Sequence, residues 1–406
     1  MTQVAAIGTY LPPWTSGGRR VRGPDEDALT MAVAAGRAAD PAAAAQRVIL
    51  VSRDFPLLEG GNAAVLLAGL SLSADTAVAE VLGGAPAVLD QIVGAGPDTL
   101  VIAADDNSGF AGAAALLTGG DGPTLTTVDR QTRSLPLVAR TNAGSRHAYA
   151  DPRLQREVGV RATAALLRLD EGKPVAAVVG AKPDLLGAHL DASSAVTEVT
   201  SSASALIRVL AAALETNVPG LVVAIEQATI GVAEVTATGT AARISRDEAD
   251  PRELPKTTIA EGIGIPMSLP AYARAFEPKI RWEAAVFDER PGIDGTPQFP
   301  PRARVDDSGV LAADYRLEPL PRTGTVYTHT TIRIPVPDLP SPYSLALVVL
   351  DESPVRVLLK VTGVPAGEAS IGQAGSVVLR RIAMRAGIPD YGYAFWPGRT
   401  RQEVPA

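Results

Sequence analysis

Apolar runs and helical patterns alternate along residues 1–244. Each apolar run is short and ends in polar residues or glycine, as buried strands of a parallel sheet do. The predicted strands are residues 1–12, 47–52, 76–81, 99–104, 124–130, 175–180, 221–225 and 231–237, the last two as a hairpin. The predicted helices are residues 25–39, 61–70, 85–94, 152–169 and 200–215, and residues 110–117 are rich in alanine. This alternation indicates α/β layers.

The two halves of this region follow a similar plan. Residues 1–130 and residues 131–244 each contain a strand, a helix, a strand with a glycine-rich exit and a closing antiparallel pair. We interpret the similarity as an internal duplication. In the first half we expect Asp25 to cap the helix that follows Pro24, with acidic residues in the first helical turn, where the helix dipole favours them.

The pattern changes after Ser245. Residues 245–297 are rich in proline and charged residues, with one amphipathic segment at residues 270–282, and we interpret them as a linker with a docking element. From Arg322 the hydrophobic period becomes two, which predicts strands at residues 325–334, 343–350, 355–362 and 375–380. Such strands between glycine and proline turns predict a small barrel within residues 298–400.

The composition narrows the classes of function. Hydrophobic residues make up 46% of the chain and aromatic residues only 4%, so the core must consist mostly of Ala, Val, Leu and Ile. The net charge of −7, without a clustered Lys/Arg run, argues against nucleic acid and anionic membrane surfaces as main partners. Because the sequence has neither an apolar run of about 20 residues nor a cleavable signal at its start, we expect a cytoplasmic protein.

Cysteine and histidine usage limits the chemistry further. The chain contains no cysteine, which excludes disulfides, thiolate zinc sites and a cysteine nucleophile together. Its three histidines, His147, His189 and His329, lie far apart in the sequence, so we expect no metal site. We interpret His189 as a structural loop residue and His329 as a half-exposed residue of a barrel strand.

Several short motifs carry a resemblance to known families. Residues 7–12, Ile-Gly-Thr-Tyr-Leu-Pro, and residues 23–27, Gly-Pro-Asp-Glu-Asp, with Thr30-Met31-Ala32-Val33 after them, resemble the hydroxymethylglutaryl-CoA synthase branch of the thiolase superfamily. Residues 298–397 resemble the OB-fold domain that accompanies thiolases, often behind a zinc ribbon. The motifs of this second resemblance are Phe299-Pro300-Pro301-Arg302, Gly324-Thr325-Val326-Tyr327-Thr328, Tyr343-Ser344-Leu345-Ala346-Leu347-Val348 and Ile371-Gly372.

The resemblance implies both a fold and an assembly. The fold is α/β and thiolase-like, a duplicated domain of five layers (α/β/α/β/α) at residues 1–244, followed by a small all-β OB-fold barrel. Proteins of this fold pair across the edge of their central sheet, so a homodimer or a hetero-oligomer is implied. A zinc ribbon before the barrel needs two cysteine pairs, which residues 275–320 do not supply, so we expect no zinc there.

The catalytic positions of the synthase family are vacated in this chain. The family chemistry uses a glutamate as acid and base, a cysteine that carries the acyl group, a histidine that orients the second acyl-CoA and an asparagine at the oxyanion. By local alignment these positions fall on Arg53, Gly83, Ala181 and Val199, none of which can do this chemistry. Gly83 lies within Glu80–Asp90, where a strand end, a Gly-Gly turn and an apolar helix start follow one another.

Other polar residues offer a different chemistry. Asp54 and Lys182 lie beside vacated positions and could form an acid/base pair, or they could be surface residues in salt bridges. His147 and Tyr149 lie in the polar loop 142–149, which is either a catalytic loop that needs no cysteine or a solvated interface loop. These residues are the alternative catalytic candidates.

The arginines near the end of the barrel raise the question of a ligand. Arg380, Arg381 and Arg385 could meet the phosphates of coenzyme A, or they could be solvated on the barrel rim. We expect no tightly bound cofactor, and a coenzyme A thioester remains a candidate ligand.

Three functions remain open after the sequence. The first is a catalytically degenerate synthase-like protein that binds acyl-CoA or scaffolds an active thiolase or aldolase in lipid, polyketide or steroid-type metabolism. The second is an enzyme with relocated catalysis, a retro-aldol C–C lyase or an acyltransferase on CoA thioesters. The third is a binding module that is unrelated to CoA. Whether the protein is an enzyme stays open, although activity that depends on a cysteine is not expected.

Overall fold

The chain folds into two compact units in the computed structural model. The first unit contains Met1–Leu11, Ala34–Phe55 and Asp75–Glu248, and the second contains Pro12–Val33, Pro56–Ala74 and the residues from Ala249 on. The structure describes residues 1–399 apart from 59, 108, 142–144, 188–189, 201, 217, 237–238, 265 and 267, and it describes residues 271–274 without their side chains. The domain boundaries predicted at 244 and 298 stay a prediction.

The first unit is built from two half-sheets of the same topology. The first half-sheet has the order β5-β4-β6-β7-β1 and the second the order β12-β11-β13-β14-β8, so each half is ordered 3-2-4-5-1 along its own sequence. In both halves the fifth strand runs antiparallel to its neighbours and the second and third strands are parallel. The strands are β1 (Thr2–Leu11), β4 (Arg47–Ser52), β5 (Ala77–Leu82), β6 (Thr99–Asn107), β7 (Phe110–Thr118), β8 (Thr124–Thr132), β11 (Val175–Val179), β12 (Val196–Glu198), β13 (Gly220–Glu226) and β14 (Thr229–Thr236). This repeated order confirms the predicted duplication.

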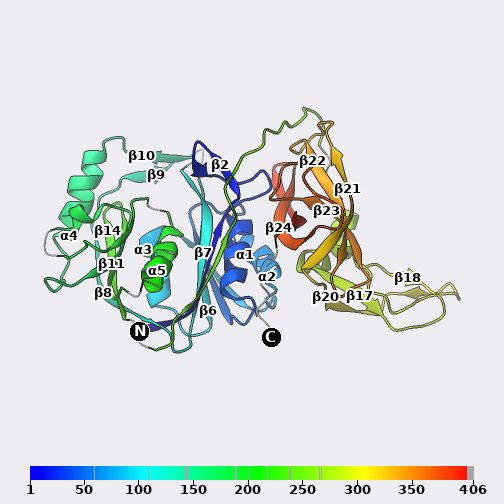
Figure 1. Ribbon diagram of the computed structural model, residues 1–406, viewed down its shortest axis with the longest axis horizontal. Coiled ribbons are helices and arrows are strands. Elements are labelled where there is room, and N and C mark those ends of the chain that lie inside the picture. Colours follow the sequence, from blue (N-terminus) through cyan, green and yellow to red (C-terminus); the bar gives the residue numbers. More distant parts are fainter. Residues whose placement is uncertain are drawn as a thin grey trace. The chain divides into compact units, whose positions relative to one another are not determined.

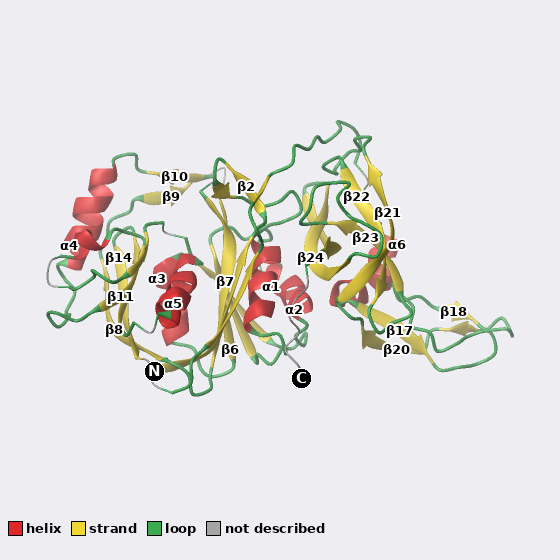
Figure 2. Cartoon of the chain, in the orientation of Figure 1, coloured by secondary structure: helices red, strands yellow, loops and turns green. Residues whose placement is uncertain are grey.

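Helices cover and separate the half-sheets to give five layers. α3 (Ala85–Val93) and α5 (Ala205–Glu215) lie between the two half-sheets, as Figures 1 and 2 show. Their buried side chains form one apolar core with both sheets, including Val88, Leu89 and Leu206. The C-terminal part of α1 (Ala28–Ala39) packs on β1 beside Gly8, where a Cβ would overlap its backbone. The π-helix η1 (Leu154–Arg161) and the short α4 (Ala162–Ala164) pack on the outer face of the second half-sheet.

The remaining strands of the first unit lie at its margins. β1 and β8 join the two half-sheets through the pairs Thr2–Leu125 and Gln3–Thr124. β15 (Arg243–Glu248), which overlaps the first residues of the segment predicted as a linker, pairs in parallel with β1. β9 (Val138–Arg140) and β10 (Arg146–Ala148) form a small antiparallel pair of their own.

Two helix predictions for the first unit were partly wrong. The helix predicted at residues 152–169 ends at Ala164, because the amides of Leu166 and Leu167 turn back to the carbonyls three residues earlier. The helix predicted to start at residue 200 starts at Ala205, because the Asp105 carboxylate accepts the amide hydrogens of Ala203 and Ser204 instead of helical carbonyls. The alanine-rich residues 110–117 form a strand.

The second unit contains a closed five-stranded barrel. Its order is β21-β22-β23-β25-β24, from β21 (Thr323–Ile332), β22 (Tyr343–Leu350), β23 (Arg356–Val361), β24 (Ala374–Arg385) and β25 (Ile388–Pro397). Along β22 half-buried and buried residues alternate, as expected for a barrel wall. The OB-fold barrel is therefore confirmed, although its last strand, β25, was not predicted. With the five layers of the first unit, this confirms the predicted fold class.

The rest of the second unit consists of short elements. They are α2 (Asn62–Leu70), α6 (Leu269–Arg281), the pair β17 (Glu283–Phe287) and β20 (Tyr315–Pro319), the pair β18 (Arg304–Val305) and β19 (Leu311–Ala312), and the strands β2 (Trp14–Ser16), β3 (Arg19–Arg20) and β16 (Arg252–Glu253). The predicted amphipathic segment corresponds to α6. Among the described residues, no helix is long and apolar enough to cross a membrane.

The acidic motif at residues 23–27 binds the barrel within the second unit. Arg380 Nη2 lies 3.3 Å from Glu26 Oε1, and each side chain is only 1% exposed. The Tyr391 hydroxyl donates to Asp27 Oδ2 at 2.8 Å. Asp27 caps α1, because its Oδ1 accepts the amide hydrogen of Thr30 at 3.0 Å. The predicted cap at Asp25 is therefore wrong, and so are the predicted acids in the first helical turn and the predicted solvation of Arg380. The acidic residues instead bind the barrel and cap the helix.

Candidate functional site

The Gly-Gly turn predicted at Gly83 lies where parallel strands of the first half-sheet end. Gly83 follows β5 and donates its amide hydrogen to the carbonyl of Ser52, the last residue of β4, at 3.3 Å. Gly84 is the N-cap of α3, and Pro86 stands in the first turn of that helix. Ligands of open α/β sheets bind at such carboxyl ends of strands, so this is the place to look for a site.

An ion pair occupies the space beside this turn. Arg53 follows β4, and its guanidinium forms a salt bridge with Glu226, the last residue of β13. The two side chains are 14% and 17% exposed. A Cβ on Gly84 would overlap the Arg53 guanidinium and lie 2.6 Å from Glu226 Oε2. The residue at the vacated glutamate position therefore fills the space that a side chain at the start of α3 would take.

A cavity of about 690 Å³ opens above this ion pair. Its lining carries five arginines and only two acidic residues, Asp54 and Glu226. The arginines are Arg53, Arg130, Arg133, Arg140 and Arg146. The cavity is thus cationic, although the net charge of the chain is negative, and it suits an anionic ligand.

The cavity arginines differ in how they are held. Arg130 Nε lies 2.9 Å from an oxygen of Asp90 on α3, and Arg133 donates to the carbonyl of Val158 at 2.8 Å. Arg140 and Arg146 stand opposite each other on β9 and β10. Two of the five cations are therefore fixed by partners outside the lining, and two come from the small hairpin at the mouth.

Of the alternative catalytic candidates, only Asp54 lines the cavity. Its Oδ2 accepts the amide hydrogen of Asp106 at 2.9 Å, which fixes the carboxylate at the edge of the sheet. His147 lies on β10 with its side chain exposed, and Tyr149 is 59% exposed. The structure therefore brings Asp54 together with Arg53 and Gly83, and it places His147 and Tyr149 outside the residues that line the cavity.

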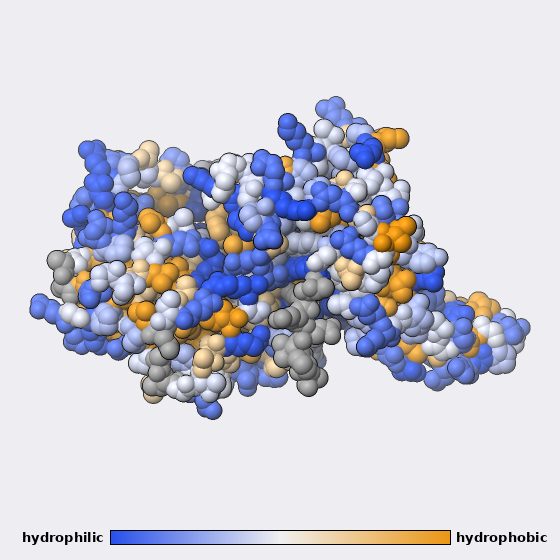
Figure 3. Space-filling model, viewed as in Figure 1, coloured by the Kyte–Doolittle hydropathy of each residue, from blue (hydrophilic) through white to orange (hydrophobic). Residues whose placement is uncertain are grey.

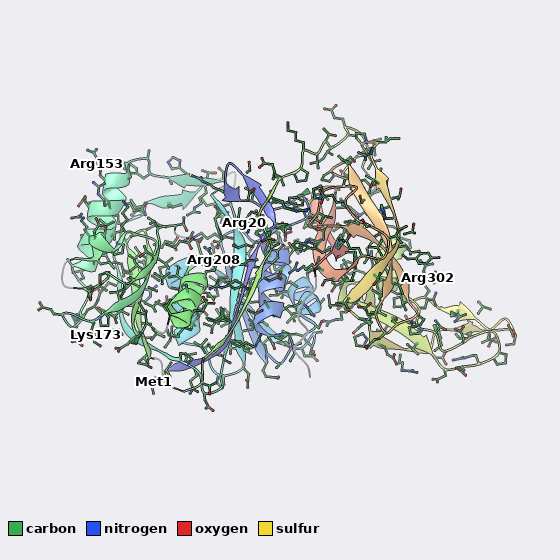
Figure 4. All side chains as sticks on the ribbon, viewed as in Figure 1. Met1, Arg20, Arg153, Lys173, Arg208 and Arg302 are labelled. Atoms are coloured by element: carbon green, nitrogen blue, oxygen red, sulfur yellow. The ribbon has the colours of Figure 1, made fainter. Side chains whose placement is uncertain are left out.

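The other vacated positions lie outside the cavity lining. Ala181 is buried at the end of β11, and Lys182 after it is exposed. Val199 is 54% exposed. It follows Glu198, whose two carboxylate oxygens each lie 2.7 Å from Nη2 of Arg208, the α5 residue labelled in Figure 4. An ion pair thus stands beside a second vacated position.

The remaining sequence candidates take structural places. His329 is half-buried on β21 opposite Ala346. Arg385 Nε donates to Asp390 Oδ2 at 2.6 Å, within the β24–β25 hairpin. His189 lies outside the described residues. Within the described part of the chain, no group of three His, Asp or Glu residues is arranged to hold a metal ion.

The sequence did not point to Asp105, which is buried where the two halves of the first unit meet. It ends the apolar part of β6, and its two oxygens accept the amide hydrogens of Ala203 and Ser204, each at 2.8 Å. Burial raises the pKa of Asp105, and the hydrogen bonds from Ser204 and Ala203 oppose this rise. The carboxylate therefore joins β6 to the start of α5. The sequence signal that could have indicated Asp105 is a polar residue at the end of a buried strand.

A comparison with protein families identifies the barrel. The family model described as "ChsH2, C-terminal OB-fold domain" matches residues 317–380, which reach from β20 into β24. The match supports the OB-fold assignment, and it covers only this part of the chain. No curated protein matches the sequence significantly.

Solved structures resemble the chain over more than half of its length. The 3-oxoacyl-(acyl-carrier-protein) synthase III of Aquifex aeolicus VF5 is 16% identical, and the match covers 58% of this chain and 99% of that chain with a TM-score of 0.46. The synthase III of Thermus thermophilus is 17% identical over 59% of this chain and 100% of that one, with a TM-score of 0.39. An OleA variant of Xanthomonas campestris is 15% identical over 58% and 98%, with a TM-score of 0.46. The fold assignment rests on the strand topology described above.

Proposed function

We propose that this protein is a catalytically degenerate, hydroxymethylglutaryl-CoA synthase-like member of the thiolase superfamily that binds an acyl-CoA without covalent chemistry. The observation that carries the proposal is the Arg53–Glu226 ion pair, which takes the space beside Gly84 at the start of α3. A side chain at position 84, next to the vacated nucleophile position Gly83, would need this space. The turn is thus retained, and a salt bridge replaces the reacting groups.

The lining of the cavity supports an anionic ligand. Coenzyme A carries phosphate groups, and the planar guanidinium fork of arginine matches phosphate oxygens geometrically. The volume of about 690 Å³ lies within the usual range of small-molecule sites, about 300–1,000 Å³. Among the described residues, the lining contains no Ser, His or Lys side chain, and the sequence has no cysteine, so binding is better supported than acyl transfer through a covalent intermediate.

Two surfaces support a role beside a partner. β5 is an edge strand whose residues are half-buried or exposed, with Leu82 63% exposed, and an edge of this kind suits a homodimer or hetero-oligomer. On the β18–β19 hairpin, Val305, Val310 and Leu311 are between 58% and 64% exposed, and Figure 3 shows hydrophobic side chains at the surface of this segment. Exposed apolar groups that gather together favour a protein partner, for which an active thiolase or aldolase is the candidate.

Calorimetric titration with coenzyme A and acetyl-CoA tests the binding. We expect binding that weakens as salt increases, because several arginines contribute. We also expect no acyl-CoA condensation or thiolysis by the purified chain, and co-purification of the chain with a thiolase or aldolase when the two are co-expressed. Turnover by the chain alone, or equal binding of CoA by a variant in which Arg130, Arg140 and Arg146 are glutamine, would contradict the proposal.

One observation favours the alternative, a retro-aldol lyase on CoA thioesters. Asp54 places a fixed carboxylate in the cavity, where it could remove the proton of a β-hydroxyl group. This reaction needs no acyl carrier. Measurement of acyl-CoA cleavage with the Asp54→Asn variant tests it: loss of a measurable activity favours the lyase, and the absence of activity in the unaltered chain favours the binding protein.

A further inference from the structure

A second cavity, of about 380 Å³, lies within the second unit beside the barrel. Barrel strands β22, β23 and β24 supply one side of it, and Trp14, Pro24 and residues 255–259 supply the other. The walls are largely apolar and include Trp14, Ile259 and Met384. OB folds bind ligands on the face of their second and third strands, which are β22 and β23 here.

Two lysines line this cavity, Lys256, which is exposed, and Lys360, which is half-buried, and Lys360 is the one held inside it. It lies near the end of β23 with its side chain half-buried, and its Nζ donates to the carbonyl of Ile382 at 3.2 Å. Nζ also stands 5.4 Å from the centre of the Tyr343 ring. Burial lowers the pKa of Lys360, and the charge of Asp25 acts in the opposite direction. The amine is therefore oriented by two contacts, faces a carboxylate and holds its proton less firmly than an exposed lysine does.

The choice of lysine at this position is unusual for the chain. Among 37 basic residues only five are lysines, namely Lys173, Lys182, Lys256, Lys279 and Lys360. Lys173, labelled in Figure 4, lies 3.4 Å from both Asp170 and Glu234, and the next three are exposed. Arginine would supply a charge equally well, but it cannot lose its proton in a protein. A lysine inside a cavity of a chain that otherwise favours arginine indicates a need for an amine.

We propose that this cavity binds a small aldehyde or ketone with an apolar body and that Lys360 reacts reversibly with its carbonyl carbon. The nitrogen lone pair forms the C–N bond, the carbonyl oxygen leaves as water with the two protons of the amine, and an imine remains. No oxidant or reductant is required. The Asp25 carboxylate, which lines the same cavity, accepts and returns the proton in transfer. The proposal is independent of CoA binding in the first unit.

Reductive trapping in the full chain tests this assignment. The protein is incubated at pH 7 with benzaldehyde and sodium cyanoborohydride, and the rate of benzylation is measured at each lysine by peptide mass spectrometry. A lowered pKa leaves more of an amine unprotonated at a given pH, so we expect Lys360 to react faster than Lys182 and Lys279, which are exposed and lie outside the cavity lining. The protein has five lysines, so each rate can be assigned separately.

Two variants provide the control. Lys360→Arg keeps the positive charge and should abolish the fast benzylation. Lys279→Arg removes an exposed lysine of α6 and should leave the rate of benzylation at Lys360 unchanged. A rate at Lys360 equal to or below the rates at Lys182 and Lys279 would overturn the proposal. Because this comparison is made inside the unaltered protein, it decides the question even if the Lys360→Arg chain does not fold.

Discussion

Loss of either charge of the Arg53–Glu226 ion pair should lower the stability of the protein. The two losses should change the affinity for an anionic ligand in opposite directions. We consider Arg53→Gln and Glu226→Gln, each of which removes one charge and leaves the partner charge in place. Breaking a fully buried pair from one side costs about 3–5 kcal/mol, and exposed pairs contribute about 0–1 kcal/mol. The side chains are 14% and 17% exposed, so after the discount for solvent screening we expect each variant to lose about 2 kcal/mol of unfolding free energy.

The affinity for an anion should move in opposite directions in the two variants. A unit charge about 8 Å from a bound phosphate contributes about 2 kcal/mol at an effective dielectric constant of about 20, and salt reduces this to about 1 kcal/mol. Glu226→Gln removes a repulsive charge and should tighten acetyl-CoA binding about fivefold, while Arg53→Gln should weaken it by a similar factor. Urea unfolding measures the first effect and calorimetric titration the second.

One control separates charge from fold, and one outcome refutes the reasoning. Arg146→Gln changes an exposed cation of the β9–β10 hairpin and should weaken binding while leaving the unfolding free energy unchanged. If Arg53→Gln and Glu226→Gln shifted the affinity in the same direction, the shift would reflect damage to the cavity and not its charge. The anion site would then have to be sought elsewhere.

Three further predictions concern residues outside this pair. Burial raises the pKa of Asp105 above the ordinary 3.8, so between these two values the folded chain holds a proton that the unfolded chain has released, and stability falls as pH rises. Urea unfolding of Asp105→Asn should therefore show its largest deficit relative to the unaltered chain at about pH 4 and a smaller deficit at neutral pH; a deficit that grows with pH would contradict this. Glu26→Gln leaves the buried Arg380 without its counter-charge and should cost about 3–5 kcal/mol, measured by thermal unfolding, whereas the double variant with Arg380→Met should recover part of the loss. His147→Ala and Tyr149→Phe change exposed side chains outside the cavity lining, so titration should show unchanged acetyl-CoA affinity, and a tenfold loss would place the substituted residue in the site.

The alternation of apolar runs was sufficient to predict the α/β layers because buried parallel strands leave a strong local signal. β25 escaped this reasoning. Its Pro389, Asp390 and Gly392 interrupt the period-two pattern, and the strand forms because it pairs with β24 over its whole length. Long-range pairing of this kind outweighs local propensity. The end of the helix at Ala164 was missed for a similar reason, since a turn of the backbone fixed it and not a proline or glycine.

The sequence was sufficient to predict where the candidate site lies, but not which residues line it. The Gly-Gly turn at Gly83 is visible in the sequence, whereas Glu226 and the hairpin arginines come from distant segments that only the folded sheet brings together. No local sequence motif marks these residues. The resemblance to the synthase family also directs attention to residues that are lost, although the ion pair between Arg53 and Glu226 is the informative feature.

The acidic motif at residues 23–27 has a consequence for synthesis of the chain. The hydrogen bond from Tyr391 to Asp27 joins residues separated by 364 positions. The motif leaves the ribosome early. Its acidic side chains remain hydrated and without their barrel partners until nearly the entire polypeptide has been made. Loop closure over such a separation is slow, so completion of the second unit should be the late step of folding. Truncation near the C-terminus would then leave nascent chains whose acidic motif lacks Arg380 and Tyr391, which makes them natural substrates for chaperones and proteases.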